Sequence, residues 1–281
     1  MILKKIKSHA KINLALNIVG KNSLLHKIES IIAFVSLHDE ISIKRIKSKE
    51  HKISFIGKFS RNIGKNNTIY QLLSLLEKKR HFYNKKFQIK IIKNIPSKAG
   101  LGGGSMNAAT LLAYFIKKKI IKLKKREIIK ISNSIGSDVV LGLNVTNSIL
   151  NSKNHIKNFF NYEKLYTLII KPNFGCSTKE IYSKVKKFTK PKFNKPKKKL
   201  FDINYLKKMS NDLEPIVFSK YTRLSKIKSF LENSSEPAFV RMTGSGSALV
   251  AYYQSEELCV NAKKIFNRKY KNYWCIASKT I

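Results

Sequence analysis

Residues Pro96–Ala109 read PSKAGLGGGSMNAA, and this stretch decides the fold. Four of the five residues from Gly100 to Gly104 are glycine. The stretch follows a segment of alternating apolar and polar residues, 87–96, and precedes a helical pattern over 105–120. Glycine lets the backbone approach a ligand closely, and a helix N-terminus carries about half a positive charge. A strand, a glycine loop and a helix in this order predict a site for phosphate groups.

Two standard phosphate-binding motifs do not fit this loop. A P-loop needs a lysine after its last glycine, and a dinucleotide fingerprint that starts at Gly100 needs a glycine at position 105, whereas Ser105 stands there. A plain turn without a ligand is the alternative. It is disfavoured because each glycine costs backbone entropy on folding, and a simple connection needs fewer of them.

The rest of the chain alternates between predicted strands and predicted helices. We expect strands over residues 4–20, 31–47, 51–57, 87–96, 147–153, 164–172 and 273–281, and a strand–turn–strand over 237–253. We expect helices over residues 68–82, 105–120, 126–136 and 255–270, and a mostly helical stretch over 202–233. Asp39 and Glu40 are expected at a turn inside 31–47. The elements lack the regular βαβ order of a doubly wound sheet, so the predicted fold class is α+β.

Length and composition limit the class of protein. The chain has 281 residues, 43% of them hydrophobic, which is enough for the core of one large or two small domains. No apolar run approaches the length of a membrane span, and no signal-peptide pattern is present, so we expect a cytoplasmic protein without a membrane contact. The three cysteines form no CxxC pair and the histidines do not cluster, so we expect free thiols and no protein-built metal site.

The net charge of +41 favours a polyanionic partner. Codon bias is the competing explanation, because AT-rich codons encode lysine, asparagine and isoleucine, which are abundant along the whole chain. No zinc finger, RNA-recognition signature or basic zipper supports nucleic-acid binding, so no nucleic acid is expected, although a basic nucleic-acid-binding protein stays an alternative. The densest lysine run, residues 184–199, predicts a solvated loop.

Three motifs in order along the chain resemble those of the GHMP kinases, a family that includes galactokinase, homoserine kinase and mevalonate kinase. PSKAGLGGGSMNAA resembles their phosphate loop, HAKINLAL (9–16) their first motif, and RMTGSGSA (241–248) their third. The resemblance implies transfer of a phosphoryl group from ATP to an alcohol. It also implies a two-lobed fold, with a ribosomal-protein-S5-like N-terminal lobe (1–155) that carries the phosphate loop and a ferredoxin-like C-terminal lobe (156–281).

Four further features resemble one branch of this family, whose substrate is an alcohol linked to cytidine diphosphate in isoprenoid precursor biosynthesis. They are the triple glycine of GLGGGS, SLLHKIES (23–30), IGSDV (135–139) and NDLEP (211–215). The chain departs from that branch at Leu24 and Leu25, where a glycine and a base-stacking tyrosine are usual, and at Met106, where a serine is usual. Homoserine kinase is the alternative within the family.

The resemblance also implies the site residues. Asp138 would be the base that takes the proton of the alcohol, and Lys11, expected next to it, would stabilise the developing charge. Mg²⁺ would accompany ATP, with a coordination shell mostly from water and phosphate. ATP itself would be held by Asn67, Pro96, Ser97, Lys98, Ala99, Gly100, Leu101, Gly102, Gly103, Gly104, Ser105 and Met106. The diphosphocytidyl substrate would meet Asn13, His26, Thr178, Tyr182 and Gly244. A monomer or a homodimer is expected.

Several of these residues have simpler explanations. Asn67 and Ser105 both suit the N-cap of a helix, and Asp138 suits a helix cap after Gly136. Lys11 is one lysine among many, but its place inside an apolar strand requires a partner or a ligand. A lone histidine such as His26 is usually an ordinary surface or core residue.

Overall fold

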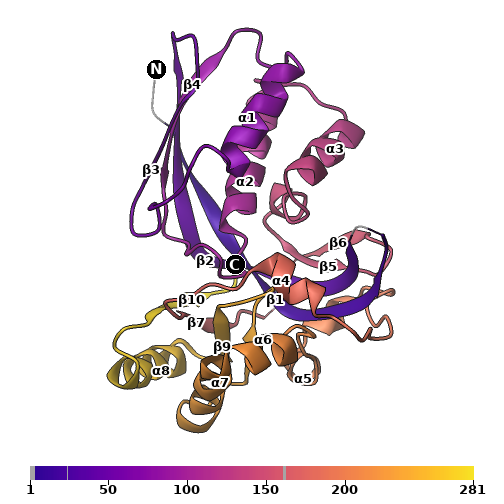
Figure 1. The fold of residues 1–281 in the computed structure, drawn as a ribbon, viewed down its shortest axis with the longest axis vertical. Coiled ribbons are helices and arrows are strands. Elements are labelled where there is room, and N and C mark those ends of the chain that lie inside the picture. The colour runs from indigo at the N-terminus through magenta and orange to yellow at the C-terminus, as the bar shows by residue number, and fades with distance from the viewer. Residues whose placement is uncertain (1–3, 24, 161–162) are drawn as a thin grey trace. The chain divides into compact units, whose positions relative to one another are not determined.

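The computed structural model describes residues 4–23, 25–160 and 163–281, which form two compact units. Unit 1 runs to Ala10, from Leu37 to Ser97 and from Gly102 to Val145. Unit 2 runs from Lys11 to Ser36, from Lys98 to Leu101 and from Thr146 to Ile281. Strands β1 (Lys4–Lys21) and β2 (His26–Ile46) each pass from one unit into the other (Figure 1).

Unit 1 combines paired strands with three helices. The C-terminal part of β2 pairs antiparallel with β4 (Lys86–Ile92), and β3 (Lys52–Ile56) pairs parallel with β4. Every second residue of β4 is buried, as the alternation of its sequence predicts. Helices α1 (Thr68–Lys78) and α2 (Gly103–Lys117) lie along one face of these strands, beside α3 (Lys125–Ile135) (Figure 1).

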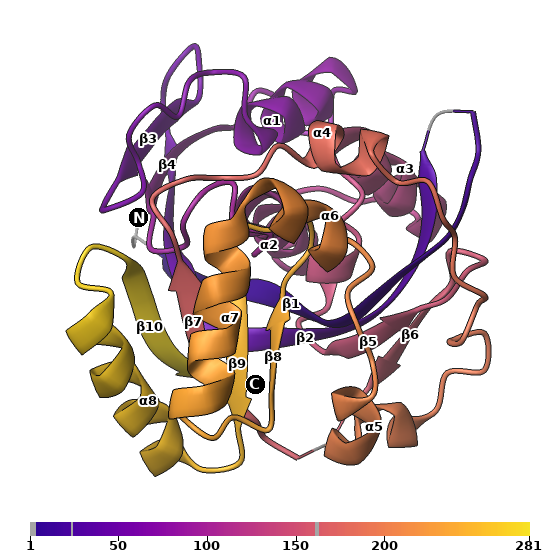
Figure 2. The same cartoon turned by 60° about the horizontal axis from the view of Figure 1, so that its bottom comes forward.

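Unit 2 contains a four-stranded antiparallel sheet in the order β10-β7-β9-β8. Its strands are β7 (Tyr166–Lys171), β8 (Phe239–Met242), β9 (Leu249–Tyr253) and β10 (Trp274–Lys279). Helices α7 (Thr222–Ser234) and α8 (Glu256–Lys269) pack on this sheet (Figure 2). The central strand β9 is buried along its whole length, which explains its continuous apolar sequence.

Further short elements complete both units. In unit 2, β5 (Asn147–Leu150) pairs with the N-terminal part of β2 and with β6 (Ile156–Phe159), a strand that the sequence patterns did not indicate. The short helices of unit 2 are α4 (Thr178–Ser183), η2 (Lys198–Phe201), α5 (Ile203–Lys207) and α6 (Glu214–Lys220). Unit 1 also holds η1 (Leu141–Leu143). The α+β prediction is confirmed, and the division into lobes at residue 155 stays a prediction.

The predicted turn at Asp39 and Glu40 is wrong, because β2 continues through both residues. Asp39 is fully buried, and its carboxylate forms an ion pair with Lys93. The same carboxylate accepts hydrogen bonds from the backbone amides of Asn94 and Ile95 at 2.7 and 2.8 Å. These partners compensate the cost of burying a charge, so the strand does not need to break there.

The mostly helical stretch predicted over 202–233 is confirmed and consists of α5, α6 and α7. Pro215 lies in the first turn of α6, where its missing N–H costs nothing, so it starts a new helix. The helix predicted from Ser105 begins two residues earlier, at Gly103.

The lysine-rich segment 184–199, which we call the strap, is the mostly exposed loop that its composition predicts, but it is anchored at particular residues. It has no helix or strand before Lys198, but Phe193 is fully buried. The backbone amides of Lys192 and Phe193 donate to the buried carboxylate of Glu29 at 2.6 and 3.0 Å. Composition predicted the loop but not these anchors, because the anchoring groups are backbone amides that carry no sequence signal.

Candidate active site

The glycine loop bends through three residues with positive φ, Lys98 (51°), Gly100 (75°) and Gly102 (69°). Gly102 is the N-cap of α2, and having no side chain it leaves the first amides of the helix uncapped. Uncapped amides at a helix N-terminus attract anions. Ser105 lies inside the first turn, so its interpretation as the N-cap is wrong, and its hydroxyl is partly exposed beside these amides.

Four consecutive carbonyl oxygens of the loop are bound within unit 2. The carbonyl oxygen of Lys98 accepts from Ser247 N (3.4 Å), and that of Ala99 accepts from Ala248 N (3.1 Å). The carbonyl oxygen of Gly100 accepts from Thr243 Oγ1 (3.2 Å), and that of Leu101 accepts from Lys11 N (3.1 Å). Three of these donors belong to the third motif, which forms a second glycine turn over 241–248. A carbonyl oxygen repels a phosphate, so binding these oxygens to the protein favours anion binding by the loop.

The two glycine turns approach each other so closely that side chains are excluded. A Cβ on Gly100 would lie 2.0 Å from the carbonyl oxygen of Thr243, and its φ of 75° disfavours any other residue. A Cβ on Gly244 would lie 3.2 Å from Cα of Gly100. These glycines are therefore required for packing of the turns, in addition to any role toward a ligand.

In unit 1, the start of α1 lies against the start of α2. The Thr68 hydroxyl donates to the carbonyl oxygen of Gly104 at 2.7 Å. Its neighbour Asn67 caps α1, with its side-chain oxygen accepting from Ile69 N and Tyr70 N, so the N-cap explanation of Asn67 is confirmed. Asn67 and the end of the glycine loop are thus brought together, and a contact between Asn67 and a nucleotide stays a prediction.

Lys11 is 5% exposed and donates from Nζ to Oδ1 of Asn13 at 2.9 Å. Asn13 is held in turn, because its Nδ2 donates to the hydroxyl of Ser30 at 2.8 Å and its backbone amide donates to Thr243 Oγ1 at 3.0 Å. The Lys11 amide binds the loop carbonyl of Leu101. The ammonium group predicted to act in catalysis is therefore fixed next to the loop residues of unit 2.

Asp138 is partly buried in the turn between α3 and η1. The residues on either side of it pack on α2, since a Cβ on Gly136 would lie 3.5 Å from Ser105 Oγ and one on Gly142 would lie 2.8 Å from Met106 Sδ. The C-cap of α3 is Gly136 and the N-cap of η1 is Val140, so the interpretation of Asp138 as a helix cap is wrong. This turn is instead placed along the first turns of the helix that follows the glycine loop.

On the predicted substrate side, the rings of His26 and Tyr182 lie 5.3 Å apart. Burial, and secondarily the charge of Lys21, lower the pKa of His26, so the imidazole is neutral near pH 7. Its Nε2 is buried and has no hydrogen-bond partner among the described residues. A neutral imidazole next to an aromatic ring suits recognition of a nucleobase edge.

Thr178 stands at the start of α4, where its hydroxyl lies 2.8 Å from that of Ser245 in the second glycine turn. Gly244, also in that turn, accepts from Asn211 through its carbonyl oxygen. Leu25, at the usual tyrosine position, is 68% exposed, whereas Leu24 lies outside the described residues. Contacts of Thr178 and Gly244 with a substrate stay predictions.

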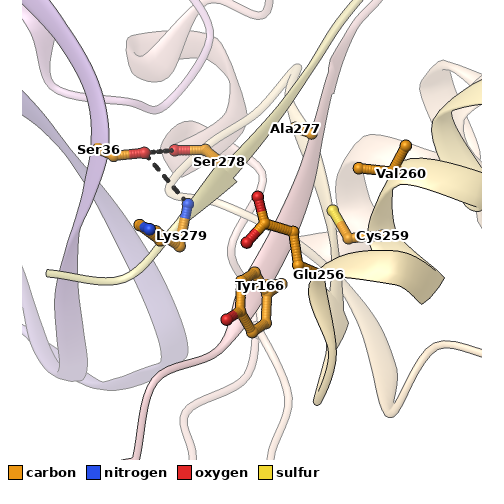
Figure 3. A pocket seen from close by; sticks show the side chains of 8 residues that line it. All are labelled: Ser36, Tyr166, Glu256, Cys259, Val260, Ala277, Ser278 and Lys279. Atoms are coloured by element: carbon orange, nitrogen blue, oxygen red, sulfur yellow. Dashed lines mark hydrogen bonds between the residues drawn. The ribbon is translucent and has the colours of Figure 1, made fainter.

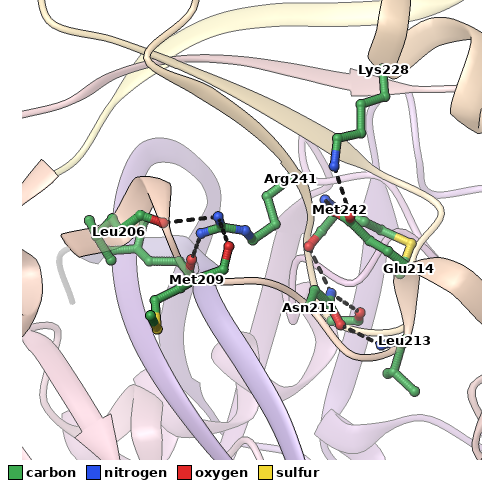
Figure 4. A network of polar contacts seen from close by, with 10 residues as sticks. Leu206, Met209, Asn211, Leu213, Glu214, Lys228, Arg241 and Met242 are labelled. Atoms are coloured by element: carbon green, nitrogen blue, oxygen red, sulfur yellow. Dashed lines mark hydrogen bonds and ion pairs between the residues drawn. The ribbon is translucent and has the colours of Figure 1, made fainter. Parts of the chain in front are cut away.

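The NDLEP segment holds the second glycine turn, a role that the sequence analysis did not assign to it (Figure 4). Nδ2 of Asn211 donates to the carbonyl oxygens of Met242 and Gly244, both at 2.8 Å. Oε1 of Glu214 accepts from the Met242 amide at 2.6 Å, and its Oε2 pairs with Lys228 at 2.9 Å. The signal was present, because a buried polar segment next to glycines requires partners.

Arg241 opens the same turn and is 4% exposed (Figure 4). Its guanidinium donates to the carbonyl oxygens of Leu14, Leu206 and Met209. The first of these lies on β1, and the other two lie in and just after α5. Arg241 therefore fixes the beginning of the turn to the strand that carries Lys11 and Asn13.

In unit 1, the buried group of Asp39, Lys93 and Asn107 supports the start of α2. Asn107, in the second turn of α2, donates from Nδ2 to Asp39 at 3.0 Å. A Cβ on Gly103 would lie 3.5 Å from Nζ of Lys93. The sequence analysis missed this group, although an aspartate inside one apolar strand and a lysine directly after another are its signal.

A pocket elsewhere in unit 2 is lined by eight residues (Figure 3). They are Ser36, Tyr166, Glu256, Cys259, Val260, Ala277, Ser278 and Lys279. The Ser36 and Ser278 hydroxyls lie 2.8 Å apart at its edge. None of these eight is a predicted site residue. Within the described ranges, no helix is long and apolar enough to cross a membrane.

Comparison with known proteins agrees with this geometry. Residues 67–151, which contain Asn67, the glycine loop and Asp138, match the N-terminal domain of the GHMP kinases. A 4-diphosphocytidyl-2-C-methyl-D-erythritol kinase from Pelagibacter ubique is 57% identical over 277 residues, which cover 99% of each chain. A protein of the same name from Francisella philomiragia is 31% identical over 91% of this chain and 89% of its own.

The solved crystal structure of a 4-(cytidine 5'-diphospho)-2C-methyl-D-erythritol kinase has the same fold. It covers 99% of this chain with a TM-score of 0.79 at 21% identity. The fold, the glycine loop and the second glycine turn define a GHMP kinase with a two-lobed α+β architecture. Within that class, the chain belongs to the family of 4-diphosphocytidyl-2-C-methyl-D-erythritol kinases, which are ATP-dependent phosphotransferases.

Proposed function

We propose that the protein transfers the γ-phosphoryl group of ATP to the 2-hydroxyl of 4-diphosphocytidyl-2-C-methyl-D-erythritol, a step of isoprenoid precursor biosynthesis. The observation that carries this proposal is the 57% identity over 99% of both chains to a kinase of that name. The substrate-side residues His26 and Tyr182 support it, because they form a neutral hydrogen-bonding edge next to an aromatic ring.

ATP is proposed to bind through its phosphates to the glycine loop. The amides of Gly103, Gly104 and Ser105 lie in the uncapped first turn of α2. The loop carbonyls that would repel a phosphate are bound elsewhere. Residues 96–106 fit this role, and Asn67, at the start of α1, is the proposed contact on the adenine side.

Mg²⁺ is proposed to accompany ATP. Within residues 4–23, 25–160 and 163–281, no group of three or more His, Cys, Asp or Glu side chains forms a metal cage. Mg²⁺ does not require such a cage, because it keeps several waters and binds substrate phosphates with few protein ligands. Ser105, in the first turn of α2, is the proposed protein ligand, and the bound ion would neutralise charge on the transferring phosphoryl group.

Phosphoryl transfer requires mainly positioning and charge stabilisation. We propose that the Asp138 carboxylate accepts the proton of the attacking hydroxyl and that the Lys11 ammonium stabilises the developing charge. Asn13 is proposed to act on Lys11 rather than only on the substrate, because its Oδ1 accepts from Lys11 Nζ and its other atoms bind Ser30 and Thr243.

The cytidine end of the substrate is proposed to meet His26, Tyr182 and Thr178. These residues belong to unit 2 and come from β2 and α4. Gly244 is proposed to serve the site through its close approach to Gly100. Cytoplasmic location, a monomeric or homodimeric state and lobes divided at residue 155 complete the proposal.

A substrate panel tests this function. Purified protein with ATP and Mg²⁺ is offered the diphosphocytidyl alcohol, homoserine and mevalonate in turn, and ADP release is measured. We expect ADP release with the diphosphocytidyl alcohol alone. ADP release with homoserine or mevalonate instead would agree with a GHMP kinase but reject the diphosphocytidyl alcohol as its substrate. No ADP release with any of the three alcohols would reject the proposed function.

A further inference from the structure

Three aromatic rings gather in unit 2 at the proposed cytidine end of the site. His26 lies at the start of β2, Tyr182 in α4 and Phe188 in the strap. The centroid of the His26 ring is 5.3 Å from that of Tyr182 and 6.4 Å from that of Phe188. Phe188 is 50% exposed, so burial in the core does not account for its position.

The strap fixes Phe188 through its neighbour. The backbone amide of Thr189 donates to the Ile18 carbonyl oxygen at 2.8 Å, and its hydroxyl donates to Asp212 at 2.6 Å. Asp212 also accepts from the Ile18 amide at 2.8 Å. The residue after Phe188 is therefore bound to β1 directly by one hydrogen bond and through Asp212 by the other two. An exposed aromatic side chain on an anchored backbone loses little conformational entropy on binding a flat ligand.

The second anchor lies further along the strap. Glu29 is fully buried and accepts from the amides of Lys192 and Phe193, and the Phe193 ring is fully buried. On the other side of Phe188, the turn after α4 is closed by a bond from the Val185 amide to the Tyr182 carbonyl oxygen. Phe188 is therefore held between two fixed points and faces a histidine whose Nε2 lacks a described partner.

The chemistry around Phe188 suits a pyrimidine nucleotide. Lys186 and Lys187 directly precede it and are exposed, so cations are available for phosphate groups. Aromatic rings bind nucleobases by stacking. Leu25, which stands where the resemblance places a base-stacking tyrosine, offers no ring. The half-exposed ring of Phe188, next to His26, is available as a second aromatic face.

We propose that Phe188, positioned by the strap, supplies that second aromatic face and determines the affinity of this protein for the cytosine ring. The inference rests on the proposed function, because it assumes that the cytidine end lies at His26 and Tyr182. Phe188 binds substrate and takes no part in the chemical step. Its removal should therefore raise KM for the diphosphocytidyl alcohol more than it lowers kcat.

The test uses cytidine 5'-diphosphate as the probe and isothermal titration calorimetry of the full chain. Phe188→Ala should weaken binding of the probe by about tenfold or more, because stacking on one aromatic ring has about that value. Phe188→Tyr should retain affinity, and Phe188→Leu, which keeps the apolar volume, should not. Phe160→Ala is the matched control, since Phe160 is 66% exposed in the same unit and belongs to no site.

Equal affinities of the Phe188→Leu, Phe160→Ala and wild-type proteins would overturn the inference. Absence of probe binding by the wild type would overturn it as well. Turnover of the diphosphocytidyl alcohol by the wild type, measured separately, distinguishes that failure from failure of the proposed function. Loss of affinity in Phe188→Leu with retention in Phe188→Tyr, at unchanged thermal stability, supports it.

Discussion

The two glycine turns of this protein look alike in sequence and differ in the structure. The first, 96–106, exposes Ser97, Lys98 and Gly104 and ends in an uncapped helix N-terminus. The second, 241–248, is buried at every residue, and its groups bind Asn211, Glu214 and the carbonyls of the first turn. Glycine content therefore does not distinguish a ligand loop from a support, whereas burial and hydrogen bonding do.

The difference assigns separate functions to the two turns. We propose that the first presents amides to a ligand, whereas the second fixes its carbonyls and permits the close approach of Gly100 and Gly244. The second turn is itself fixed by NDLEP and Arg241. Substitutions that disturb the contact between the turns should have the largest effects, and those at the edge of the second turn the smallest.

The largest effect is expected for Gly100→Ala. The added Cβ would lie 2.0 Å from the Thr243 carbonyl oxygen, so the turns must separate. Because a displacement of about 1 Å costs about 100-fold in rate, kcat/KM should fall by at least about that factor. Gly64→Ala is the control, since its Cβ meets nothing within 4 Å. Steady-state kinetics measure kcat/KM of both variants. Equal values for Gly100→Ala and Gly64→Ala would show that the close contact between the two turns is not required for activity.

A smaller effect is expected for Asn211→Ala, which removes the side chain that holds the second turn. Two buried carbonyl oxygens, of Met242 and Gly244, lose their donor. The free energy of unfolding should fall by about 1–3 kcal/mol, as for other buried groups left unsatisfied. Urea denaturation measures this loss, with the exposed Asn204→Ala as control. A stability equal to that of the control would show that NDLEP does not support the turn.

The smallest effect is expected at the edge of the second turn, for Thr178→Val. The exposed Thr178 shares one hydrogen bond with Ser245, at 2.8 Å, and a bond of this kind contributes about 0.5–1.5 kcal/mol. KM for the alcohol should rise by about threefold. Ser245→Ala should have a similar effect, and the double variant should not add to it, because both changes remove the same bond. Additive increases in KM would show that Thr178 and Ser245 act independently of their shared hydrogen bond.

Local patterns predicted those parts of the fold that depend on neighbours in the sequence. The alternation of Phe87, Ile89 and Ile91 predicted β4, and the glycines predicted the loop. The role of Asp39 could not be read in this way, because its partners Lys93 and Asn107 are 54 and 68 residues away. The acidic pair Asp39 and Glu40 in an apolar strand was therefore interpreted as a turn.

The same limit applies to the site. Lys11, Asp138 and the loop were predicted through motifs. Glu29 anchors the strap through backbone amides, which have no sequence signature, and Asp212 anchors it through the Thr189 hydroxyl, 23 residues away. Asn211 belonged to a recognised motif, but its partners Met242 and Gly244 lie 31 and 33 residues further on. Motifs indicated the candidate site residues, and only the structure showed which residues support others.

Turnover of the diphosphocytidyl alcohol by wild type and Asp138→Asn tests whether the protein phosphorylates this alcohol with Asp138 as the general base. With saturating ATP and Mg²⁺, the account predicts substrate-dependent ADP release by the wild type. It predicts a loss of about 10²–10⁴-fold in the variant, the usual contribution of a general base. Affinity for ATP should be retained, because the glycine loop is unchanged. Full activity of Asp138→Asn, or no activity of the wild type, would contradict the account.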